Sequence, residues 1–90
     1  IKDEVLQTEE LAAELIRFLA ANYPGVLENK YTITTAPDPY VMLGRIAESR
    51  HCLVRGNELD TEKAAMLLMD DFREGKLGRL TLEYPQTEEA

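Results

Sequence analysis

The residue types that most often carry out catalysis or bind metals are scarce in this chain. Its 90 residues include one cysteine, Cys52, and one histidine, His51, which are neighbours. Adjacent side chains usually diverge, so a Cys–His nucleophilic pair is not expected, and a structural zinc site needs about four ligands. A phosphate-binding GxxxxGKS/T loop is also missing. The sequence therefore predicts no catalytic residues, metal site or cofactor in this chain, and it predicts Cys52 to be a small core residue.

The net charge of −7 suggests two classes of small acidic domain, which the sequence disfavours. A calcium-binding EF-hand needs a DxDxDG loop, and the chain has none. An acyl carrier attaches its pantetheine arm to a serine in an Asp-Ser-Leu setting, whereas Ser49 stands between Glu48 and Arg50.

Basic side chains in the second half of the chain are the remaining candidates for binding chemistry. Residues 1–29 and 80–90 carry net charges of −4 and −3, whereas residues 30–79 hold equal numbers of acids and bases. Arginine's planar fork suits bidentate contact with phosphate or stacking on an unpaired base. We therefore predict a set of RNA-contact residues: Arg50, Arg55, Lys63, Lys76 and Arg79. The alternative is that each is solvated surface, with Arg73 and Lys76 complementing the dipole of a helix end.

A helix over residues 60–74 would position most of these side chains. Asp60 is a good N-cap, and Gly75 can take the left-handed conformation that closes a helix. Between these signals an apolar stripe recurs at helical spacing, formed by Ala64, Ala65, Leu68 and Phe72. Residues 52–54 before it are expected to be an apolar plug, followed by a turn at Gly56-Asn57.

Three further helices are expected earlier in the chain. The first begins with Thr8 as N-cap and ends at Pro24-Gly25, and residues 1–6 are expected to add a short helical turn packed beside it. A short helix covers residues 26–31. The third starts with Asp38 as N-cap and Pro39 in the first helical position. Their predicted buried faces are Leu11, Ala12, Leu15, Ile16, Phe18, Leu19 and Tyr23 in the first and Tyr40, Leu43, Ile46 and Ala47 in the third. Gly44 costs about 1 kcal/mol against alanine within a helix, so we expect a close helix–helix contact there.

These elements predict an all-α fold: a small bundle of four or five short helices with an extended C-terminal tail, in which Leu80, Leu82 and Tyr84 alternate with polar residues. Residues 1–84 are expected to form one domain and residues 85–90 a frayed tail. No apolar run approaches the roughly 20 residues of a membrane span. The single cysteine favours a reducing compartment, so we expect a cytoplasmic monomer.

Several short runs, in this order, resemble the C-terminal domain of the ribosome biogenesis GTPase RbgA (YlqF) family. They are Ile1-Lys2-Asp3-Glu4; Arg50, Cys52, Leu53, Gly56, Glu58, Asp60 and Ala64; Phe72-Arg73; Gly75-Lys76-Leu77-Gly78-Arg79; and Thr81-Leu82-Glu83. His51 and Asn57 stand where that pattern has glycines. Asparagine tolerates the left-handed conformation, whereas histidine adopts it less readily, which leaves the geometry of that turn open.

The resemblance implies an rRNA-contacting helical module, similar to the ANTAR type, in a GTPase that acts late in assembly of the large ribosomal subunit. The implied partners are the large-subunit precursor, through rRNA and ribosomal proteins, and the protein's own G domain. That circularly permuted domain would lie upstream and bind GTP and Mg²⁺, so this chain would not itself be an enzyme. The alternative hypothesis is an acidic helical protein-interaction or regulatory module that docks on a partner or on its own upstream domain.

Overall fold

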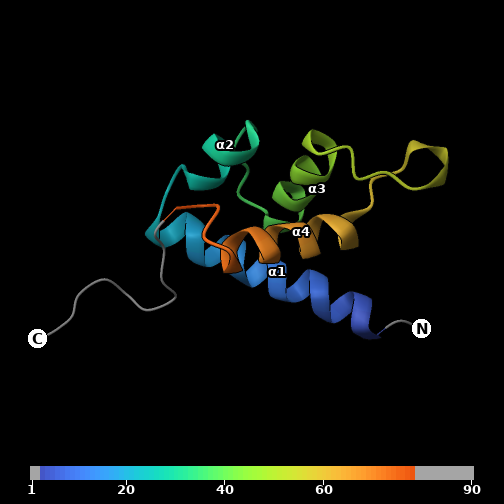
Figure 1. Cartoon of the computed structure of the whole chain (residues 1–90), viewed down its shortest axis with the longest axis horizontal. Helices are drawn as coiled ribbons and strands as arrows, with labels where there is room; N and C mark the ends of the chain where they lie inside the picture. Colours follow the sequence, from blue (N-terminus) through green and yellow to red (C-terminus); the bar gives the residue numbers. More distant parts are fainter. Residues whose placement is uncertain (1–2, 79–90) are drawn as a thin grey trace, which may run out of the picture.

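The computed structural model describes residues 3–78 as a bundle of helices (Figure 1). Within this range it has four α-helices, α1 (Asp3–Asn22), α2 (Val26–Tyr31), α3 (Pro39–Ser49) and α4 (Thr61–Arg73), and a 3₁₀ turn, η1 (Arg55–Asn57). The predicted all-α bundle is confirmed. The predicted extended tail with Leu80, Leu82 and Tyr84, and the domain boundary after residue 84, lie outside the described residues.

Aspartate side chains start α3 and α4 as the sequence predicts. The Asp38 carboxylate accepts a hydrogen bond from the backbone N–H of Tyr40 at 2.9 Å, and Pro39 occupies the first turn of α3. The Asp60 carboxylate accepts from the backbone N–H of Lys63 at 3.1 Å. Both bonds satisfy donors that a helix leaves free in its first turn, so these two helix starts are encoded locally.

The predicted start of α1 at Thr8 is wrong. The helix begins at Asp3, so Thr8 lies within it and is not its N-cap. Glu4, Leu6 and Gln7 are strong helix formers, and a threonine inside a helix costs only a few tenths of a kcal/mol, roughly, against them. The helix therefore extends through Thr8 toward the N-terminus.

The core lies where α1, α3 and α4 meet. α1 and α4 lie side by side and run in the same direction (Figure 1). Near their starts the Thr61 hydroxyl donates to a Glu9 carboxylate oxygen at 2.7 Å. α3 packs against both helices, and α2 contacts α1. The buried side chains include Ala12, Ile16, Leu19, Leu27, Tyr31, Met42, Leu43, Ile46, Ala47, Cys52, Ala64, Ala65, Leu68 and Leu77.

Some residues predicted to be buried are exposed instead. Leu11 is 56% exposed and Tyr40 is 44% exposed, because α1 and α3 bury narrower faces than their apolar patterns suggest. Of the predicted plug at residues 52–54, only Cys52 is buried, as expected for a free thiol, while Leu53 and Val54 are exposed. These exposed apolar side chains are available to a partner.

The predicted helix–helix contact at Gly44 is also wrong. A methyl group added there would meet only the Leu59 Cδ1 atom, at 3.6 Å, an ordinary van der Waals distance. Leu59 belongs to the segment that leads into α4 and not to a helix. Packing within residues 3–78 therefore does not require a glycine at this position.

Candidate RNA-contact surface

The segment between α3 and α4 folds back on itself as a hairpin, residues 52–60, which projects from the bundle (Figure 1). The Val54 N–H donates to the Glu58 carbonyl at 2.8 Å, and the Asp60 N–H donates to the Cys52 carbonyl at 2.7 Å. An isolated antiparallel bridge joins Leu53 to Leu59. These backbone bonds give the hairpin a defined shape.

Left-handed residues make the turn that leads into this segment and the turn at its tip. His51 has φ of 57° and Asn57 has φ of 66°, the region that glycine enters most easily. Both residues thus keep the conformation that the family resemblance expects of glycine. The left-handed turn therefore forms with histidine at position 51.

Arg55 lies in η1 at the tip of the hairpin, and Lys63 lies in the first turn of α4. Both side chains are exposed. Within residues 3–78 neither side chain makes a hydrogen bond or an ion pair. No residue in that range therefore competes with a phosphate group for either positive charge.

Arg50 fastens α2 to the end of α3. Its Nη2 donates to the Lys30 carbonyl at 3.1 Å, and its guanidinium lies over the Tyr31 ring, 5.0 Å from the ring centroid. A cation–π contact of this kind contributes about 0.5–1 kcal/mol at an exposed site. Although Arg50 was predicted to contact RNA, the structure gives its side chain intramolecular partners.

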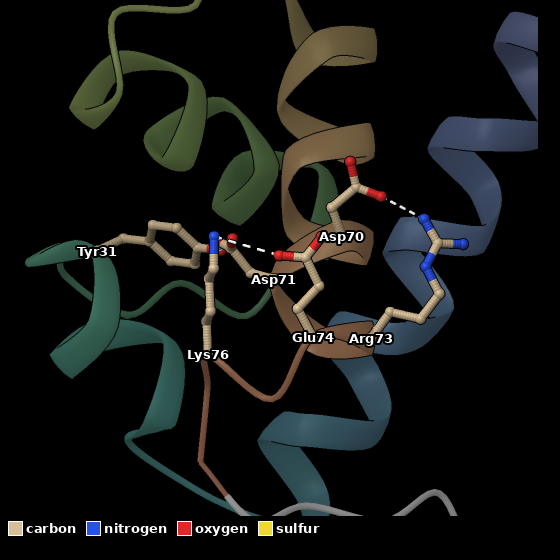
Figure 2. Close-up of polar contacts among 6 residues, drawn as sticks. All are labelled: Tyr31, Asp70, Asp71, Arg73, Glu74 and Lys76. Atoms are coloured by element: carbon tan, nitrogen blue, oxygen red, sulfur yellow. Dashed lines mark hydrogen bonds and ion pairs between the residues drawn. The ribbon is translucent and has the colours of Figure 1, made fainter.

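A buried hydrogen bond that the sequence analysis missed connects α2 to α4. The Tyr31 hydroxyl donates to a carboxylate oxygen of Asp71 at 2.7 Å, and both residues are buried (Figure 2). Burial raises the pKa of the Tyr31 phenol far above its ordinary value, and the bond to Asp71 and its negative charge act in the same direction. Arg50 lowers that pKa, but its effect is smaller. The sequence does place Asp71 three residues after Leu68, on the buried side of its helix. This spacing does not, however, identify Tyr31 as the hydrogen-bond donor to Asp71.

The basic residues at the far end of α4 have acidic neighbours. Arg73 pairs with Asp70, and the Lys76 Nζ lies 3.2 Å from a carboxylate oxygen of Glu74 (Figure 2). All four side chains are more than half exposed, so each pair contributes little to stability. Arg79, the last predicted contact residue, lies outside the described residues.

The predicted contact residues do not form one cluster. Lys63 lies in the first turn of α4, whereas Lys76 follows its end, and 13 residues of helix span about 20 Å. The hairpin with Arg55 leads directly into the start of α4 (Figure 1). Arg55 and Lys63 therefore share one end of the molecule and are its strongest candidates for RNA contact.

Within residues 3–78 no three His, Cys, Asp or Glu side chains come together as metal ligands would. No helix in that part of the chain is long and apolar enough to cross a membrane.

Comparison with known proteins gives related sequences over almost the whole chain. The chain is 34% identical over 87 residues to ribosome biogenesis GTPase A of Bacillus cereus, which covers 96% of the chain and 29% of that protein. It is 33% identical over 90 residues to the protein of the same name from Priestia megaterium, covering 99% of the chain and 31% of that protein. No family model matches the chain.

The aligned region lies at one end of these relatives. The chain spans less than a third of their length, and the matched part is their C-terminal part. It has the helical fold that the resemblance implied. The chain therefore belongs to the ribosome biogenesis GTPase A family and corresponds to the C-terminal part of its members.

Proposed function

We propose that this chain is the non-catalytic C-terminal helical domain of a ribosome biogenesis GTPase and that it contacts rRNA in the large-subunit precursor. The names of its relatives support a role in ribosome assembly. The chain has no GxxxxGKS/T loop, so GTP and Mg²⁺ would be bound by the rest of the protein, its G domain. This work would take place in the cytoplasm, with the protein as a monomer.

One observation carries the proposal of rRNA contact: the projecting hairpin presents Arg55 at its tip with no partner among the described residues. A fixed backbone reduces the entropy that a contact must overcome. The guanidinium can then form two parallel hydrogen bonds to a phosphate or stack on an unpaired base. Lys63 adds a second positive charge toward the same end of the molecule.

A charge-removal experiment tests this assignment. Arg55→Ala combined with Lys63→Ala should reduce co-sedimentation with large-subunit precursor particles by about tenfold, which corresponds to a loss of about 1.4 kcal/mol of binding free energy when two phosphate contacts are removed. The matched control is Arg73→Ala, which removes an exposed arginine that pairs with Asp70 at the other end of α4. The control variant should bind as the unaltered chain does.

The comparison of the two variants also distinguishes rRNA contact at the hairpin from a general effect of charge. Equal loss per removed charge in the control and test variants would indicate a general charge effect, and undiminished binding of the double variant would refute rRNA contact at the hairpin. Arg50 is unsuitable for this test, because its replacement would also break its contacts with Lys30 and Tyr31.

A further inference from the structure

Exposed apolar side chains gather on the outer face of α3 and on the hairpin. In α3, Gly44 follows Tyr40 and Val41 by one turn, and the side chains of Tyr40 and Val41 are exposed. Leu53 and Leu59 face each other across the bridge of the hairpin, which places their side chains on one face of it. We call these five residues the α3 patch; its four large side chains are 42–44% exposed.

Gly44 joins the two halves of this patch. The nearest atom to a methyl group added at Gly44 is Leu59 Cδ1, at 3.6 Å, so the base of the hairpin lies against the middle of α3. Apolar residues on a surface are ordinary when they are scattered singly, but a contiguous group suggests a site of interaction.

The glycine itself indicates a contact with another molecule. Glycine inside a helix costs about 1 kcal/mol against alanine, and the structure has room for a methyl group at this position. Its φ is not left-handed, because the glycines with positive φ are others: Gly25, Gly56, Gly75 and Gly78. Among residues 3–78, neither packing nor backbone conformation accounts for Gly44, whereas close approach of a partner's backbone would.

Acidic side chains surround the patch. Glu48 follows Gly44 by one turn of α3, Glu58 precedes Leu59, and Glu10 and Glu14 line a surface hollow together with Tyr40. Of the bases near the patch, Arg17 pairs with Glu14 and Arg45 donates to the carbonyls of Thr34 and Thr35, whereas Arg55 at the tip of the hairpin has no partner among residues 3–78. An acidic border disfavours nucleic acid and favours a basic protein.

We propose that the α3 patch is a docking surface for a basic segment of a partner protein, with aliphatic side chains set against Leu53 and Leu59 and its backbone close to Gly44. This goes beyond the proposed rRNA contact, which uses Arg55 and Lys63. The domain would then bind RNA and protein through different residues.

Peptide binding followed by amide chemical shifts tests the docking surface. The probes are a short amphipathic helical peptide of leucine, alanine and lysine, the same peptide with glutamate in place of lysine, and a single-stranded oligouridine. The lysine peptide should shift the amides of α3, Leu53 and Leu59. The other two probes should leave these amides unchanged, because RNA contact is expected at Arg55 in the tip of the hairpin.

Two variants locate the contact. Gly44→Leu adds a bulky side chain where the partner's backbone would lie close to α3. It should weaken lysine-peptide binding by about tenfold or more, as the loss of a central contact does. Leu59→Lys should do the same through charge and lost apolar contact. The matched control is Met66→Lys on the outside of α4, since Met66 is 53% exposed and outside the patch, and it should bind normally.

Three results would overturn the proposal: equal shifts with the glutamate peptide, oligouridine shifts at these same amides, or unchanged binding by both Gly44→Leu and Leu59→Lys. Circular dichroism of each variant establishes that the fold is retained. Binding of the lysine peptide by an Arg55→Ala, Lys63→Ala chain keeps this result independent of rRNA contact.

Discussion

At the scale of single residues, the hydrogen bond from Tyr31 to Asp71 is a buried and specific contact between two helices. It joins residues 40 positions apart, and its two partners lie on different helices. A buried carboxylate without a donor is costly, so the bond favours the one arrangement of α2 against α4 that satisfies it.

Removing the Tyr31 hydroxyl should destabilise the domain. Tyr31→Phe leaves the buried Asp71 carboxylate without this donor, and we expect the free energy of unfolding to fall by about 1–3 kcal/mol. Urea denaturation measures the change. In a double-mutant cycle, Tyr31→Phe should cost much less when Asp71 is already alanine; equal costs in both backgrounds would mean that the bond contributes nothing.

Alkaline pH should weaken the fold through the same residue. The pKa of Tyr31 in the folded protein lies above the ordinary tyrosine value of 10.0. The stability contribution is therefore fully present below pH 10, and it decreases as pH rises above 10 because only the unfolded chain then releases this proton. Urea midpoints measured across this range should fall with pH, and they should fall less steeply in Tyr31→Phe. Parallel slopes for the two proteins would argue against a raised Tyr31 pKa.

At the scale of helices, we expect Gly44 to lower the stability of α3. Gly44→Ala should raise the free energy of unfolding by about 1 kcal/mol, because alanine favours the helix and the added methyl makes only an ordinary contact with Leu59. Thermal and urea unfolding measure the gain. A loss of stability would show that α3 needs the glycine for its own packing and would remove the reason for a partner there.

The N-cap of α4 should contribute measurably. Asp60→Ala removes the acceptor for the Lys63 N–H and should cost about 1 kcal/mol, while Asp60→Asn, which keeps an acceptor, should cost less. Urea unfolding of the two variants gives the comparison. Because Asp60 lies next to Leu59, a larger loss would indicate that the hairpin is disturbed as well.

Local signals explain which parts of the fold were predictable. Asp38, Pro39, Asp60 and Gly75 act on their own neighbours in the chain, and each helix boundary they predicted is found. The prediction that α1 starts at Thr8 was wrong because an N-cap signal competes with the helix propensity of the residues before it. The exposure of Tyr40 depends on how α1 and α3 meet, which periodicity along one helix does not contain.

The candidate site was predictable only in part for a related reason. Charge and residue type selected Arg55 and Lys63 as candidates, and the structure leaves both without partners among the residues it describes. The same criteria selected Arg50 and Lys76, whose side chains contact the Lys30 carbonyl and Glu74. Which cations are engaged depends on contacts across the fold, and sequence spacing does not give these.

At the scale of the whole molecule, a net charge of −7 limits how RNA can be held. With two cations in contact, binding to single-stranded RNA should weaken with salt with a slope of about −1.4 in logarithmic units, roughly 0.7 per phosphate contact. Titrations of oligouridine at several salt concentrations measure it. A much steeper slope would mean that more basic residues take part, such as Lys76 and Arg79 among those predicted.

The side-by-side arrangement of α1 and α4 also has a consequence for how the domain is made. The buried face of α1 packs more extensively against α4, a helix that starts at Thr61, than against α3 or α2. During synthesis from the N-terminus, that face stays without its main cover until α4 has left the ribosome. Folding should therefore wait for nearly the whole segment and then occur in one cooperative step, so chains that stop after α3 should be targets for chaperones and proteases.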